Sequence, residues 1–141
     1  MPSYHQWHFQ RGYTHALGLP IVARILIVDD DAADRIVLST ILERAGHETF
    51  IAEDGEAALR EYRGKAIEVV ITEPQMPKVR YLELITLLRR FTPRPAIIAI
   101  SGTGSDQLDI AHAVGAEATL TKPVTPAELL SAVAEAVASE A

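Results

Sequence analysis

The sequence predicts a doubly wound α/β domain, in which helices cover both faces of a parallel sheet. Short runs rich in β-branched residues recur about five times, and each is followed by apolar residues at helical spacing. The connections between them are short, and strands joined through helices run parallel with right-handed crossovers. With 141 residues, of which 48% are hydrophobic, the chain is long enough for one domain with a buried core.

The first strand and the helix after it have the clearest patterns. Residues 24–28 form a uniformly apolar run, which is typical of a strand buried on both faces. Gly46 is a candidate C-cap for the helix that follows. The apolar stripe of that helix consists of residues at helical spacing, namely Ile36, Val37, Ile41 and Leu42.

The remaining elements continue the alternation of strand and helix. Further strands are expected at residues 47–52, 67–72, 96–100 and 118–121. Helices are expected around the apolar groups at residues 57–62, 82–89, 110–114 and 126–137. Pro126 suits the first turn of the last helix, because a first-turn residue needs no backbone N–H.

Composition excludes several classes of protein. The chain contains no cysteine, which excludes disulfides, zinc–thiolate sites and cysteine nucleophiles. No apolar run approaches the ~18 residues that a membrane span needs. The net charge is −6 and all 19 acidic residues follow Arg24, so the folded part is acidic and direct contact with nucleic acid is disfavoured.

Residues 1–22 differ from the rest of the chain. They contain three of the five histidines and no acidic residue. The spacing of His5, His8 and His15 matches no common metal-binding pattern, and the segment lacks the apolar stretch of a signal peptide. We therefore expect a flexible N-terminal arm at residues 1–22 and the folded domain at residues 23–141, with no output domain after it.

Polar groups follow four of the predicted strands directly. The acidic cluster 29–31 follows the first strand, Glu73 the third, Ser101 the fourth and Lys122 the fifth. In an open parallel sheet the carboxyl ends of the strands share one edge, where ligands bind. Clustered carboxylates repel one another and need a cation such as Mg²⁺ or lysine. Each group alone has an ordinary structural explanation, but all four in this order indicate a site.

Two of the acidic residues have a simpler role. Asp31 is expected to cap the helix that begins near Ala32, and Asp34 to be favoured by the helix dipole. A cap needs only one carboxylate, so Asp29 and Asp30 are left for the site.

Over roughly residues 23–139 the chain resembles the receiver domain of two-component response regulators. Residues 25–31 resemble the first strand of that family and its metal-binding acidic pair, and residues 73–77 resemble its phosphoacceptor run, which begins with Asp. Ser101 with Gly102 matches the hydroxyl residue and its small neighbour. The resemblance implies a five-stranded, flavodoxin-like fold with strand order 2-1-3-4-5.

The resemblance also assigns a role to the basic residue of the site. Lys122 with Pro123 matches the lysine and proline of the family, which are joined by a cis bond. Lys122 and Ser101 would contact a phosphoryl group received from a histidine kinase. Mg²⁺ would be held by Asp29, Asp30 and the acceptor carboxylate, with the backbone carbonyl of Gln75.

The chain departs from the family at three places. Glu73 replaces the acceptor Asp, and its extra methylene moves the carboxylate ~1.5 Å further into the crevice, toward Lys122. Residues 78–81 replace a usual Asp-Gly pair and should make that loop more basic and less flexible. Thr119 occupies the position of the switch aromatic, so the usual coupling to Ser101 is absent.

We therefore expect a stand-alone, atypical receiver that is not an enzyme and acts as a protein-interaction module without conventional aspartyl phosphorylation. One alternative is a working Mg²⁺-dependent phosphoacceptor that uses Glu73 or Asp30. A less favoured one is a phosphatase of the haloacid dehalogenase type, whose Asp-x-Asp motif residues 29–31 resemble, although Ala32 follows here in place of a glycine. A flavin or nucleotide site is disfavoured because carboxylates replace a glycine-rich phosphate cradle.

The partner would be a signalling protein, such as a histidine kinase or a downstream effector. The resemblance places the partner face at residues 111–119 and on the last helix. We expect a cytoplasmic monomer or weak homodimer that binds neither nucleic acid nor membrane. Mg²⁺ is the one cofactor that could bind, weakly.

Overall fold

The computed structural model describes residues 22–74, 78–102 and 115–139. Five parallel strands form one sheet in the order β2-β1-β3-β4-β5, which confirms the predicted fold class and strand order. The strands are β1 (Arg24–Val28), β2 (Glu48–Ala52), β3 (Val69–Thr72), β4 (Ala96–Ser101) and β5 (Ala118–Thr121).

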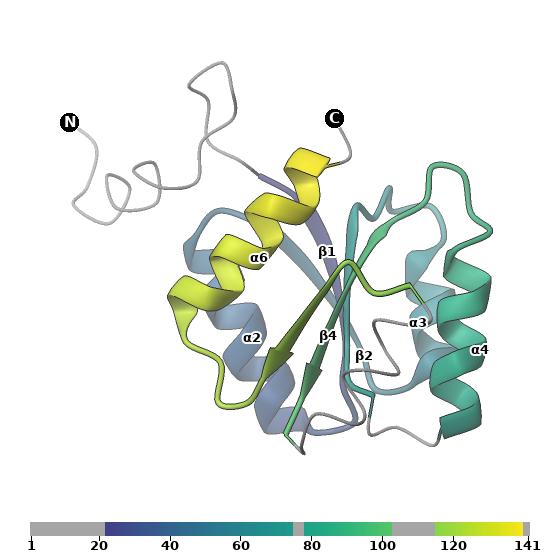
Figure 1. The fold of residues 1–141 in the computed structure, drawn as a ribbon, viewed down its shortest axis with the longest axis horizontal. Coiled ribbons are helices and arrows are strands. Elements are labelled where there is room, and N and C mark those ends of the chain that lie inside the picture. The colour runs from purple at the N-terminus through teal and green to yellow at the C-terminus, as the bar shows by residue number, and fades with distance from the viewer. Residues whose placement is uncertain (1–21, 75–77, 103–114, 140–141) are drawn as a thin grey trace.

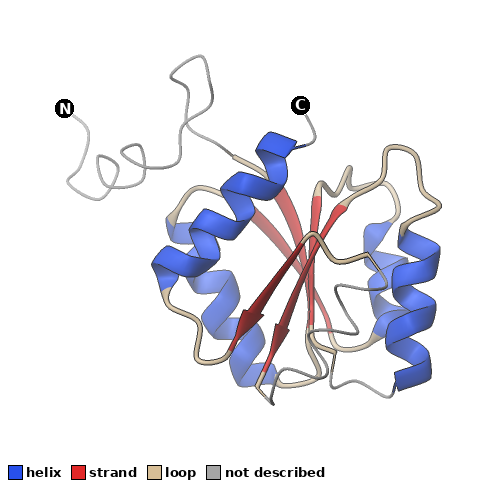
Figure 2. Cartoon of the chain, in the orientation of Figure 1, coloured by secondary structure: helices blue, strands red, loops and turns tan. Residues whose placement is uncertain are grey.

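Helices cover both faces of this sheet. Figure 1 shows α2 and α6 on one face and α3 and α4 on the other, and Figure 2 shows the strands as the central layer. Within the described ranges, no helix is long and apolar enough to cross a bilayer. The helix predicted around residues 110–114 lies outside the described residues. The described helices are α2 (Ala32–Arg44), α3 (Gly55–Tyr62), α4 (Lys78–Leu88) and α6 (Pro126–Ser139).

The core is divided by the sheet into two apolar clusters. Alternate side chains of a strand point to opposite faces, so Ile25 and Ile27 of β1 pack with α2 and α6, whereas Leu26 and Val28 pack with α3 and α4. Every residue of β3 and β4 is buried. Strands buried on both faces read as continuous apolar runs, which is why these strands were recognisable in the sequence.

The buried face of α2 differs from the predicted one. The helix itself is present, but Ile36 and Val37 are 65% and 55% exposed, and the buried residues are Leu38 and Leu42. Residues four apart lie on one helical face, so this stripe continues back to Asp34. The helix therefore turns Asp34 toward the carboxyl edge of the sheet and leaves two branched apolar side chains outside.

The segment after β3 was also predicted incorrectly. Residues 78–81 were expected to form a loop, but they are the first turn of α4. Tyr81 is 2% exposed and packs into the cluster on the α3 and α4 face. Burial of this aromatic side chain stabilises the helical conformation in this segment.

Candidate functional site

The backbone hydrogen bonds of the sheet continue for one residue beyond the carboxyl ends of β1, β3 and β5. The backbone N–H of Asp29 donates to β2 at 3.1 Å, that of Glu73 to β1 at 3.2 Å and that of Lys122 to β4 at 2.8 Å. These hydrogen bonds fix the three residues at the same edge of the sheet. The sequence-based expectation that the polar strand ends converge is therefore confirmed for these three positions.

One lysine lies among three carboxylates at this edge. Lys122 Nζ is 2.7 Å from Asp34 Oδ2, 2.8 Å from Glu73 Oε2 and 3.2 Å from Asp29 Oδ2. Asp29 and Glu73 are each 2% exposed. We call these four residues the lysine cluster.

Lys122 is held in this position along its length. Its aliphatic stem passes beside Gly102, where an added Cβ would lie 3.6 Å from the Lys122 Cδ atom. The bond between Lys122 and Pro123 is cis, as the resemblance implied. Burial disfavours the charged ammonium group, but hydrogen bonds to Asp34 and Glu73 and the charges of Glu73 and Asp29 outweigh it and raise the pKa of Lys122 above its ordinary value.

Asp29 is the more buried of the two aspartates in the cluster. Burial raises its pKa, while a 2.9 Å hydrogen bond from the Asp31 backbone N–H and the charge of Lys122 act in the opposite direction. The Arg35 side chain donates to the Asp29 backbone carbonyl at 2.6 Å. The carboxylate is therefore held between a backbone donor and the lysine.

Asp34 and Arg35 were not predicted as members of the site. Asp34 does lie in the first turn of α2, as its assignment to the helix dipole required, but that account is incomplete because its carboxylate contacts Lys122. Asp31 caps the helix as expected, accepting hydrogen bonds from the backbone N–H groups of Ala33 and Asp34. The available signal was the spacing of Asp34 from Leu38 and Leu42, which places all three on the sheet-facing side.

Tyr81 is a buried tyrosine that lies within the electrostatic influence of Glu73. Tyr81 is 2% exposed, and its hydroxyl has no hydrogen-bond partner among the described residues. Burial, and secondarily the negative charge of Glu73, raise its pKa above the ordinary value. Tyr81 therefore stays a neutral phenol beside the carboxylate.

Two further predicted site residues lie on the neighbouring strands β4 and β5, and the Ser101 backbone carbonyl accepts the hydrogen bond from the Lys122 N–H. Ser101 ends β4 and is fully buried, and Thr119 is half-buried on β5. Ala118 and Leu120 pack toward α6, so strand alternation points Thr119 to the opposite face of the sheet.

Two of the four predicted magnesium ligands, Asp29 and Glu73, contact Lys122. Asp30 is exposed, and Gln75 lies outside the described residues. Both oxygens of Asp29 are engaged, one by the Asp31 N–H and one by Lys122. In the described ranges, no group of three or more histidine or acidic side chains is arranged to hold a metal ion. The ammonium group of Lys122 provides positive charge to these carboxylates.

Chemically, the lysine cluster is a nearly closed ion network. Its open side is formed by the side chains of Lys122 and Asp34, which are 24% and 37% exposed. Glu73 lies beneath them and faces the lysine. Such a network connects the ends of β1, β3 and β5 to the first turn of α2.

Residues 25–134 match the response regulator receiver domain family, and the chain belongs to this family. The match extends from β1 into α6 and therefore includes every strand of the sheet. The resemblance drawn from the strand-end residues is confirmed at the level of the family. The protein thus contains a receiver domain of two-component signalling.

Three relatives illustrate how much of the chain is matched. A response regulator receiver domain protein from Clostridium thermocellum is 32% identical, with a TM-score of 0.74 over 84% of this chain and 96% of that one. The chemotaxis protein CheY of Thermotoga maritima is 31% identical over 77% of this chain and 92% of its own length. The sensory/regulatory protein RpfC of Xanthomonas campestris is 30% identical over 82% of this chain, which spans only 17% of RpfC.

Proposed function

We propose that this domain is an atypical receiver, which works as a protein-interaction module without conventional aspartyl phosphorylation. The observation that carries the proposal is the ion pair between Lys122 Nζ and Glu73 Oε2, at 2.8 Å. By the family resemblance, Glu73 stands where the acceptor aspartate would be, and Lys122 stands where a lysine would contact the phosphoryl group. The Glu73 carboxylate, one methylene further from the backbone than that of an aspartate, gives Lys122 a counter-charge from the chain itself.

The geometry around Glu73 opposes phosphoryl transfer. In-line attack needs a carboxylate oxygen aimed at phosphorus, and a misplacement of ~1 Å can cost ~100-fold in rate. Glu73 is 2% exposed and faces the lysine, so an incoming phosphoryl group would have to separate a buried ion pair. The pair also replaces, in part, the charge that a phosphoryl group would bring to Lys122.

The surface of α2 beside the lysine cluster supports the interaction role. A hollow of about 350 Å³ is lined by Asp34, Val37, Lys122 and Pro123 among others. Val37 is 55% exposed, and neighbouring Ile36 is 65% exposed. A signalling partner seated here, such as a kinase or an effector, would touch both apolar surface and the exposed side of the cluster.

The test is an intact mass measurement after incubation with acetyl phosphate and Mg²⁺. The native chain, Glu73→Asp and Asp30→Asn are compared under the same conditions. We expect no phosphoryl adduct on the native chain. An adduct on Glu73→Asp alone would mean that shortening one side chain restores the acceptor.

Two other outcomes have defined meanings. If the native chain gains a phosphoryl mass, the proposal is wrong, and peptide mapping of the adduct locates the acceptor. If neither the native chain nor Glu73→Asp gains it, the departure from phosphotransfer extends beyond Glu73, and the proposal of an interaction module stands.

A further inference from the structure

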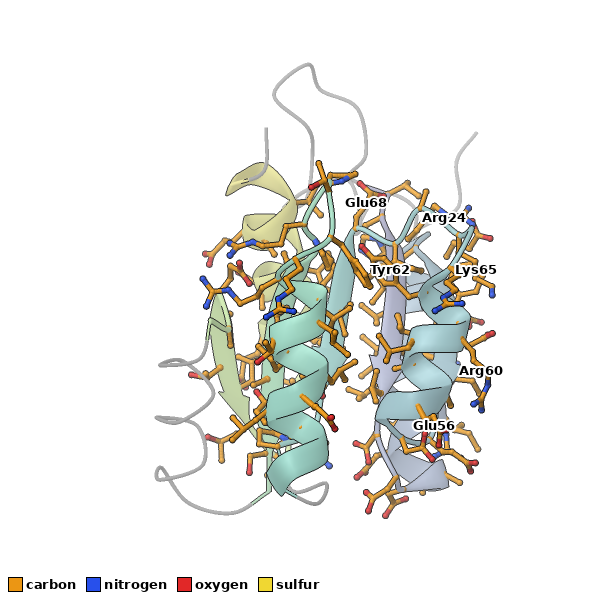
Figure 3. All side chains as sticks on the ribbon, turned by 90° about the vertical axis from the view of Figure 1, so that its right-hand side faces the viewer. Arg24, Glu56, Arg60, Tyr62, Lys65 and Glu68 are labelled. Atoms are coloured by element: carbon orange, nitrogen blue, oxygen red, sulfur yellow. The ribbon has the colours of Figure 1, made fainter. Side chains whose placement is uncertain are left out.

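A groove runs between α3 and α4 on the face of the sheet opposite α2 and α6. It consists of two adjoining hollows of about 230 Å³ and about 770 Å³, which share Leu59 of α3 and Leu87 of α4 in their linings. Figure 3 shows the two helices side by side, with side chains of both flanking the space between them. The groove is separate from the lysine cluster and does not depend on Glu73.

The floor of the groove is apolar. Leu84 is buried beneath it, and Leu59 and Leu87 are half-buried along its sides. At its wider end the rings of Tyr62 and Phe91 stack with their centroids 4.7 Å apart. Half-buried leucine and aromatic side chains in a row are the surface that the apolar face of a helix covers in helix-in-groove recognition.

The two ends of the groove carry opposite charge. The smaller hollow is lined by Glu56 and Glu83, and its described lining contains no basic residue. Figure 3 shows Glu56 at one end of the helices and Arg24 with Glu68 at the other. The larger hollow is lined by three arginines and one glutamate, namely Arg24, Arg63, Arg94 and Glu68.

Part of this charge is already used within the domain. Arg24 pairs with Glu48 at 2.5 Å and Arg94 with Glu117 at 2.7 Å. The Glu68 carboxylate accepts a hydrogen bond from the Arg24 backbone N–H. Arg63 is exposed and makes no ion pair within the described ranges. An acidic group on a partner therefore has a cation to meet at this end.

Helix dipoles explain only some of these residues. Glu56 lies in the first turn of α3 and Arg63 follows its last turn, where each complements the dipole. Glu83 lies in the middle of α4, where no such effect acts. Nor do the dipoles explain an unfilled apolar groove that joins the two charged ends.

We propose that this groove binds an amphipathic helix of a partner protein, which runs antiparallel to α3 and α4. Helices favour acidic side chains in their first turn and basic ones in their last. Because α3 and α4 both connect parallel strands, they share one direction, and their carboxyl ends lie at the arginines. An antiparallel helix brings its acidic first turn to Arg63 and its basic last turn to Glu56 and Glu83.

The length of the groove sets the length of the partner segment. The two helices contain 8 and 11 residues. At 1.5 Å per residue they span roughly 12–16 Å, which corresponds to two or three turns of a docked helix. The partner segment therefore needs about three apolar anchors, at i, i+4 and i+7.

The probe is a pair of synthetic amphipathic peptides of about 14 residues. Both carry leucine at the anchor positions. One has glutamate in the first turn and lysine in the last, and the other has these charges exchanged. Fluorescence anisotropy is measured with the native chain, Leu87→Lys, and the double variant Arg63→Glu/Glu83→Lys.

The native chain is expected to bind the first peptide at least about tenfold more tightly than the second. Leu87→Lys should weaken binding by about tenfold or more, and the double variant should invert the preference between the two peptides. Ile51→Lys is the matched control, because Ile51 is an exposed apolar residue of β2 outside the groove lining, and it should leave binding unchanged. Circular dichroism checks that each variant is folded.

Several results would overturn the proposal. These are binding weaker than about 1 mM for both peptides, equal binding of the two, or insensitivity to Leu87→Lys. Sedimentation of the native chain without peptide is measured in parallel. Self-association that Leu87→Lys abolishes would make a second copy of this chain the occupant, and the assignment to a partner helix would be wrong.

Discussion

Lys122 balances three carboxylates with a single ammonium group. Removing it by Lys122→Met would leave Asp29 and Glu73 buried together without a cation. Breaking a buried ion pair from one side costs about 3–5 kcal/mol, and we expect a loss of stability in this range. The free energy of unfolding from urea denaturation measures it.

A double-mutant comparison separates the charge effect from lost packing. Adding Glu73→Gln to Lys122→Met removes one of the stranded charges, so the double variant should be more stable than Lys122→Met alone. Lys65→Met is the matched control, because Lys65 forms a more exposed i, i+4 pair with Glu61, which contributes roughly 0.5 kcal/mol or less. If Glu73→Gln makes the lysine variant still less stable, Glu73 is not stranded by the loss of Lys122.

Thr72 precedes Glu73 and points to the opposite face of β3. It is 1% exposed, and its hydroxyl has no hydrogen-bond partner among the described residues. A buried unpartnered hydroxyl carries its full desolvation penalty, so Thr72→Val should raise the free energy of unfolding by about 1 kcal/mol. Thr49→Val, which removes a hydroxyl that donates to Glu43, should produce no such gain. Equal effects at both positions would contradict this account.

Among the helices, α2 is capped at its N-terminus by Asp31. The Asp31 carboxylate accepts hydrogen bonds from the backbone N–H groups of Ala33 at 2.8 Å and Asp34 at 3.2 Å. Asp31→Ala should therefore destabilise the domain by about 1 kcal/mol, whereas Asp31→Asn retains a capping oxygen and should cost less. Thermal unfolding compares the two. Equal losses would mean that the charge of Asp31, and not its cap, stabilises the helix.

The element scale also shows where sequence patterns were insufficient. The position of α2 was predicted, but its rotation was not, because Ile36 and Val37 are as apolar as the residues that are buried. The contact between Asp34 and Lys122, 88 positions apart, joins elements at opposite ends of the domain. Such a contact has no local signature, since it depends on how the helix is turned against the sheet.

At the scale of the whole molecule, prediction succeeded because the sheet is buried on both faces. Fully buried strands such as β1 and β4 leave continuous apolar runs, and the polar residues after them mark the strand ends. The family resemblance supplied the strand order, which the periodicity of the chain does not contain. The role of His47 was missed because a lone histidine at a strand start carries no pattern.

His47 connects the amino-terminal ends of β1 and β2. It is 7% exposed, and its Nδ1 accepts a 3.0 Å hydrogen bond from the backbone N–H of Ala23. Burial lowers the pKa of His47 below its ordinary value of 6.5. Below that value the unfolded chain binds a proton that the folded chain does not, so stability falls as the pH decreases.

Replacing His47 with asparagine isolates this effect. Asparagine offers an acceptor near the position of Nδ1 but does not titrate. Between about pH 7 and pH 5 the native chain should lose stability with a His47-dependent slope of no more than about 1.4 kcal/mol per pH unit, which one proton sets. His47→Asn should be flatter over the same range in urea denaturation. If the two profiles are parallel, His47 is protonated in the folded domain as readily as in the unfolded chain, and its burial does not govern the acid sensitivity of the protein.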